Sequence, residues 1–190
     1  MSVARREHLV DRIVEIHPRL APFIRSMSSD LTAGSWDLVS FSFQRGFEAM
    51  WDQAQIDSSG LLVRPLLSLW RQSVELTIKA AVIELAGGLD LKSGHDLTNL
   101  FDQLLKARVA LGCNDDDDLT QDVAAMIAWV QSFDPTADRF RYPASRKGEP
   151  YSGVDADLDE LLQAHWIITT WCEGAVVEVE EGRSGTSPSF

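Results

Sequence analysis

The feature that most constrains the fold is the segment of residues 61–86, which is apolar around nearly its whole circumference when it is arranged as a helix. Such a helix is about 40 Å long, and a helix that is apolar on all sides has to be surrounded by other elements. Gly87 and Gly88 follow directly and end the segment, as glycine commonly does after a helix. We therefore expect residues 61–86 to form the central helix of an all-α domain.

Apolar residues at three- and four-residue steps predict further helices before and after this segment. The expected helices span residues 3–16, 35–54, 94–111, 120–133 and 155–180. Ser35 and Thr120 are the expected N-caps of two of them, and residues 134–153 are expected to be irregular. The pattern predicts one domain, residues 1–181, folded as a bundle of four to five long helices with extra short helices, and a flexible tail, residues 182–190.

The chain of 190 residues is acidic, with 17 Lys and Arg against 29 Asp and Glu and a net charge of −12. This charge argues against broad binding of nucleic acid, because phosphate contacts supply most of that affinity, and it favours a basic protein as partner. No apolar run reaches the ~18 residues of a membrane span, and the N-terminus lacks the apolar stretch of a signal peptide. We expect a cytoplasmic protein that does not bind membranes.

The residues that bind metals and cofactors do not occur at the required spacings. Cys113 and Cys172 form no CxxC pair, and the histidines are not spaced four apart. The aspartate run at residues 115–118 lacks the alternating ligands and the glycine of a calcium loop. Glycine-rich phosphate-binding motifs are absent as well. The sequence predicts no metal, no cofactor and two free thiols.

Two charged residues, Glu75 and Lys79, interrupt the apolar central helix on one stripe, four positions apart. An isolated buried charge is very costly, so these charges must pair or reach an opening. One interpretation is a structural ion pair at the margin of the helix. The other is a polar cluster with His95 and Asp96, which start the next helix, where either residue can also serve as a helix cap.

Three segments in this order resemble the HEPN superfamily, a group of small helical bundles. They are the Glu75-Leu76 to Lys79 helix, the Gly94-His95-Asp96-Leu97 helix start, and the loop Arg139-Phe140-Arg141-Tyr142-Pro143. The resemblance covers about residues 61–175. It implies a HEPN-like bundle that forms a homodimer and acts in a prokaryotic defence, toxin–antitoxin or RNA-processing system.

Many members of this superfamily are metal-independent ribonucleases, and the resemblance implies an arginine followed four to six residues later by a histidine near the start of the last helix. The histidine handles the proton and the arginine stabilises the charged phosphorane. Here the last helix holds His165, but no arginine stands among residues 158–164. The one matching pair is Arg12 and His17, in the first helix. We therefore expect a non-catalytic HEPN-like interaction module.

Two alternative functions remain open. In the first, the chain is a metal-independent endoribonuclease whose catalytic residues are His95, Arg139 and Arg141, or else Arg12 and His17. In the second, it is a nucleotide-binding partner of a nucleotidyltransferase. A basic cluster bears on both alternatives, because aromatic rings among cations can stack on bases; it consists of Arg139, Arg141, Tyr142, Arg146 and Lys147. In the non-catalytic interpretation its arginines pair with the protein's own carboxylates.

The apolar residues Trp166, Ile167, Ile168 and Trp171 form a patch on the last helix. Their simplest role is in the core, and the alternative is a homodimer face.

Overall fold

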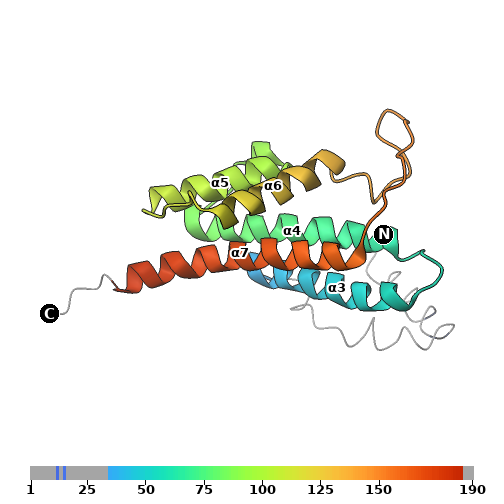
Figure 1. Ribbon diagram of the computed structural model, residues 1–190, viewed down its shortest axis with the longest axis horizontal. Coiled ribbons are helices and arrows are strands. Elements are labelled where there is room, and N and C mark those ends of the chain that lie inside the picture. Colours follow the sequence, from blue (N-terminus) through green and yellow to red (C-terminus); the bar gives the residue numbers. More distant parts are fainter. Residues whose placement is uncertain (1–11, 13–14, 16–33, 186–190) are drawn as a thin grey trace. The chain divides into compact units, whose positions relative to one another are not determined.

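The computed structural model describes residues 12, 15 and 34–185 of the chain. Two compact units are formed, residues 1–35 and 36–190. The described residues of the second unit form five α-helices and a short 3-10 helix, which are α3 (Trp36–Ile56), α4 (Val63–Ala86), η3 (Leu91–Ser93), α5 (Leu97–Ala110), α6 (Asp118–Phe133) and α7 (Leu158–Gly185) (Figure 1). The predicted all-α bundle is thereby confirmed. The expected helix over residues 3–16 lies outside the described residues, apart from Arg12 and Glu15, which are helical.

Helix α4 is the central element, as its all-round apolarity predicts, and it packs against α3, α5 and α7. Its side chains Leu66, Val74, Ile78 and Val82 are almost completely buried. The helix ends at Gly87, whose left-handed backbone (φ 73°) directs its amide to the carbonyl of Ile83 at 2.8 Å. A residue with a side chain is strained in this conformation, which explains the glycine.

The starts of the next two helices differ from the expected ones because aspartates cap them. Asp96 accepts a hydrogen bond from the amide of Asn99 at 3.0 Å, so α5 begins at Leu97 rather than at residue 94. Asp117 caps α6, and the expected cap, Thr120, is wrong: its amide and its hydroxyl both donate to Asp117.

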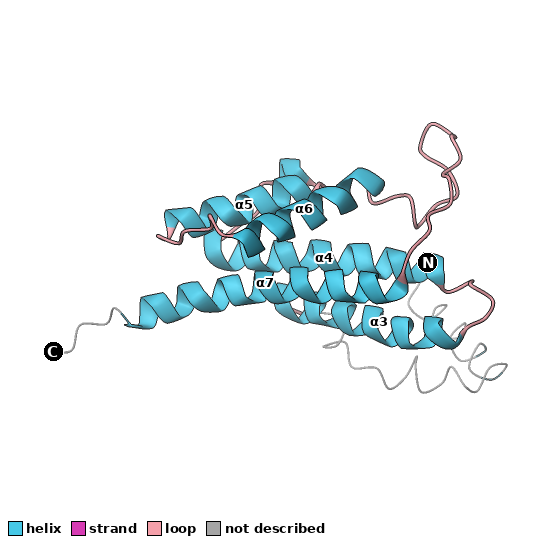
Figure 2. Ribbon diagram, viewed as in Figure 1, coloured by secondary structure: helices cyan, strands magenta, loops and turns pink. Residues whose placement is uncertain are grey.

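Irregular chain connects α6 to α7, as expected, and projects from one end of the bundle (Figure 2). Among the described residues, its β-pairing is limited to an isolated antiparallel bridge between Ala144 and Pro150. Helix α7 then begins at Leu158 and continues to Gly185, beyond its expected end near residue 180. None of the described helices combines the length and the apolarity that crossing a membrane requires.

The apolar patch of α7 is only partly core. Ile168 is fully buried and Trp171 is half-buried, whereas Trp166 is 50% exposed and Ile167 42% exposed. Consecutive residues of a helix point in directions about 100° apart, so three apolar residues in a row cannot all face one core. The expectation that Trp166 and Ile167 belong to the core is therefore wrong.

Candidate functional site

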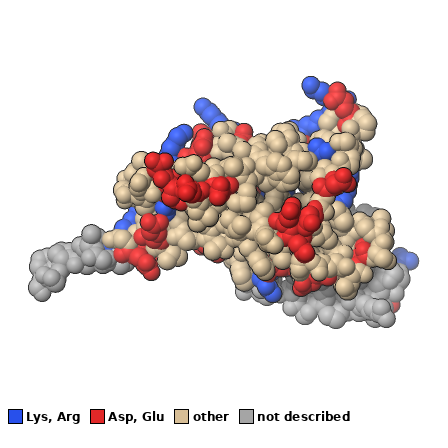
Figure 3. Space-filling model, viewed as in Figure 1, with Lys and Arg blue, Asp and Glu red and all other residues tan. Residues whose placement is uncertain are grey.

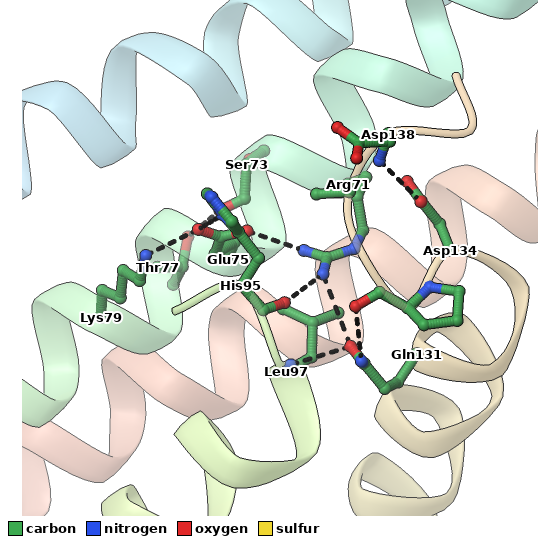
Figure 4. A network of polar contacts seen from close by, with 12 residues as sticks. Arg71, Ser73, Glu75, Thr77, Lys79, His95, Leu97, Gln131, Asp134 and Asp138 are labelled. Carbon is green, nitrogen blue, oxygen red and sulfur yellow. Dashed lines mark hydrogen bonds and ion pairs between the residues drawn. The ribbon is translucent and has the colours of Figure 1, made fainter. Parts of the chain in front are cut away.

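A buried carboxylate, that of Glu75, is the centre of a polar cluster between α4 and the start of α5 (Figure 4). Its Oε1 accepts hydrogen bonds from Lys79 Nζ at 2.7 Å and from His95 Nδ1 at 2.9 Å. Its Oε2 accepts from Arg71 Nη1 at 3.0 Å. The four-residue spacing of Arg71, Glu75 and Lys79 places all three on one face of α4. The expected contact of Glu75 with Lys79 and His95 is present.

The electrostatic balance in this cluster favours the ionised carboxylate. Desolvation by burial acts to raise the pKa of Glu75, but the hydrogen bond and charge of Lys79, the charge of Arg71 and the hydrogen bond of His95 outweigh it. The pKa of Glu75 therefore lies below its ordinary value. A carboxylate that is held in this way is a poor proton acceptor at neutral pH.

Arg71 is a member of the cluster that was not predicted from the sequence. Its side chain is 2% exposed, and it joins Glu75 to the backbone carbonyl of His95. Burial lowers the pKa of Arg71 while Glu75 and Asp134 act to raise it, and a guanidinium keeps its charge in proteins. The spacing in the sequence could have indicated this residue, because Arg71 precedes Glu75 by the same four residues that separate Glu75 from Lys79.

Gln131 connects the cluster to the end of α6. Its Oε1 accepts from the amide of Leu97 at 2.9 Å and lies 3.5 Å from Arg71 Nη2, while its Nε2 donates to the carbonyl of Pro135 at 3.1 Å. The cluster thus joins α4, the first turn of α5 and the last turn of α6 (Figure 4).

The two residues at the start of α5 have different roles. The side chain of His95 is 52% exposed, although its Nδ1 is held by the buried Glu75. Asp96 points its carboxylate to the backbone amide and the side-chain amide of Asn99, each at 3.0 Å. Asp96 is therefore the helix cap, and His95 is the residue that joins the polar cluster.

Two arginines of the basic cluster, Arg139 and Arg141, form hydrogen bonds with neighbouring parts of the chain. Arg139 donates to the carbonyls of Phe133 and Ser152, both at 3.1 Å. Arg141 donates to the carbonyl of Ala137 and to Asp138. Within the described residues neither arginine makes a hydrogen bond with His95.

Three further residues of the basic cluster are more exposed. The exposed side chain of Arg146 lies 3.3 Å from the buried carboxylate of Asp138. Tyr142 is 52% exposed, and the guanidinium of Arg141 lies 5.7 Å from the centre of its ring. Lys147 is exposed as well. Arg12, from the alternative nuclease pair, is exposed, and His17 lies outside the described residues.

His165, the histidine of the last helix, lies in the core rather than in a cleft. It is 1% exposed, its Nε2 shares a hydrogen bond of 2.9 Å with Ser73 Oγ, and its ring lies 4.4 Å from that of Phe47. Burial lowers its pKa to about 4, so the ring is neutral at physiological pH. Across the described part of the chain, no group of three or more His, Cys, Asp or Glu is arranged to hold a metal ion.

Comparisons with protein-family models, with curated proteins and with solved structures find no match for this chain.

Proposed function

We propose that this chain is a non-catalytic, HEPN-like helical module that acts by binding another protein in a prokaryotic defence or stress system. The supporting observation is the state of Glu75, which is 1% exposed and neutralised by three donors from the same chain. The cluster to which the family resemblance points is thus used to join helices. A buried charge network of this kind holds its elements in one arrangement when every member is paired.

The surface charge suggests the class of partner. A net charge of −12 attracts basic proteins and repels nucleic acid, and complementary charge speeds association and selects partners. We further propose a cytoplasmic homodimer as the acting form. The free thiols of Cys113 and Cys172 suit a reducing compartment.

A second candidate function, metal-independent RNA cleavage, is favoured by the exposure of His95. Its ring is half-exposed while the buried Glu75 holds one of its nitrogens. A carboxylate that orients a solvent-accessible imidazole is a common arrangement for proton transfer near neutral pH.

The experiment that separates the two functions is incubation of the full chain with single-stranded RNA in excess EDTA and at low salt. We expect no cleavage. Cleavage that survives chelation and falls about 10²-fold or more in both His95→Ala and Arg141→Ala, but not in the exposed-arginine control Arg45→Ala, would establish the nuclease. Cleavage that is lost in Arg12→Ala and His17→Ala would assign it to the first helix instead.

A further inference from the structure

The outer face of the seam between α6 and α7 contains two neighbouring cavities. One, of about 450 Å³, is lined by Met126 and Trp129 of α6 and by Leu161 and Ala164 of α7, among others. The second, of about 610 Å³, is lined by residues that include Leu119 of α6 and Ile167, Thr170, Trp171 and Glu178 of α7. Later residues of α6 lie beside earlier residues of α7, so the two helices run antiparallel and both cavities follow one seam. We name this feature the seam groove; it spans most of α6, whose 16 residues measure about 24 Å.

Large apolar side chains in the seam groove are open to solvent. Trp129 is 57% exposed, Leu119 55%, Trp166 50% and Ile167 42%. A single exposed apolar residue is ordinary on a protein surface, but several on two adjacent helices beside cavities are typical of an interaction site. This surface explains why Ile167 is apolar although it lies outside the core, whereas the indole of Trp166 donates to Glu48 of α3 at 3.2 Å.

Carboxylates line both cavities of the groove. Asp155, Asp157 and Glu160 line the first cavity, and none of the described residues lining it is Lys or Arg. The second cavity contains Arg108, but Asp115 and Glu178 neutralise this arginine at 2.7 and 2.9 Å. In Figure 3 acidic side chains form separate groups over this face, with surface that is neither acidic nor basic between them. The groove therefore fits a ligand that is apolar along its middle and positively charged at its margins.

We propose that the seam groove binds an amphipathic helix of a basic protein partner. Its apolar stripe packs on Leu119, Trp129 and Ile167, and its Lys or Arg side chains pair with Asp155 and Glu160. An extended apolar groove with a charged rim is the usual receptor for such a helix. A second copy of this chain fits less well, because each copy would bring a carboxylate-lined groove to the interface. This inference rests on the proposed function and specifies the class of its partner.

The test uses a synthetic helix of the same length as α6, with leucine at positions i, i+3, i+4 and i+7 and lysine elsewhere. A matched peptide carries glutamate in place of each lysine. Binding to the full chain is measured by fluorescence anisotropy of the labelled peptides. We expect the lysine peptide to bind and the glutamate peptide not to bind; failure of the lysine peptide to bind would overturn the proposal.

Two pairs of variants locate the binding. Ala125→Arg places a bulky cation in the first cavity, while Ala128→Arg makes the same change at an exposed site of the same helix that does not line the groove. The double change Asp155→Lys with Glu160→Lys is matched by Asp52→Lys with Asp102→Lys, which alters the net charge equally on α3 and α5. We expect each groove variant to weaken binding at least about tenfold and each control less than about twofold.

Equal weakening by the groove and control variants would mean that bulk charge alone attracts the peptide, and the proposal would be wrong. Sedimentation of the same variants tests the other occupant. A dimer that Ala125→Arg dissociates and Ala128→Arg does not would show that a second copy fills the groove, which would also overturn the proposal. RNA cleavage would contradict the proposed function without changing these binding results, so the two failures are distinguishable.

Discussion

His165 shows how one buried residue makes the stability of the fold depend on pH. Its Nε2 faces Ser73, and its Nδ1 is buried without a hydrogen-bond partner within the described residues. Burial lowers its pKa from 6.5 to about 4 in the folded chain. Between these values the unfolded chain binds more protons than the folded one, so the free energy of unfolding falls as the pH falls.

We predict that His165 lowers the free energy of unfolding by about 2 kcal/mol between pH 7.5 and pH 5, and that His165→Gln removes this part of the loss. Urea unfolding of both proteins at the two pH values measures it. The lowered pKa of Glu75 contributes stability that is lost only as the pH falls below its ordinary value of 4.5, so Glu75 contributes little to the change in this window. An equal loss in the variant and the unmodified chain would contradict the prediction.

Lys79 contributes through its carbon chain as well as through its charge. Its side chain is 15% exposed, and its Nζ contacts Glu75. Lys79→Met and Lys79→Ala both remove the charge, but methionine keeps a long apolar chain against the bundle. We predict that Lys79→Met destabilises less than Lys79→Ala, by about 1 kcal/mol in urea unfolding. Equal destabilisation would show that the charge alone matters.

The start of a helix depends on which of several suitable residues serves as its N-cap. Asp117 caps α6 although Thr120 and the neighbouring aspartates are also good capping residues. The sequence therefore predicts where α6 begins to within a few residues but not which side chain caps it. The same applies to α5, where both His95 and Asp96 were suitable and the backbone uses Asp96.

Substitution of Asp96 tests its assignment as a cap. Asn keeps an oxygen that can accept from the amide of Asn99, whereas Ala does not. We predict that Asp96→Ala lowers the free energy of unfolding by about 1 kcal/mol and that Asp96→Asn changes it little. Thermal unfolding followed by circular dichroism measures both. If the Asn variant lost as much free energy of unfolding as the Ala variant, the charge of Asp96 would contribute more than its capping hydrogen bond.

In the whole molecule, the sequence predicts the all-α class and the position of α4, because an apolar helix surface requires neighbours on every side. It also predicts the contact of Glu75 with Lys79 and His95, since Glu75 and Lys79 are four residues apart on one helix and a short connection leads from that helix to His95. It does not predict Gln131, which the fold brings to Arg71 from 60 residues away. Nor does it predict the exposed face of α7, because its run of apolar residues does not show which of them face solvent.

The central position of α4 also determines how the bundle unfolds. Helix α3 packs mainly on α4, and α5 and α7 each rest a large part of their buried faces on it. When α4 separates from the bundle, the helices that pack on it expose apolar surface that no other described helix can cover. We therefore expect the described helices to unfold as one cooperative unit, in which a local opening that reaches α4 becomes the unfolding of the whole bundle.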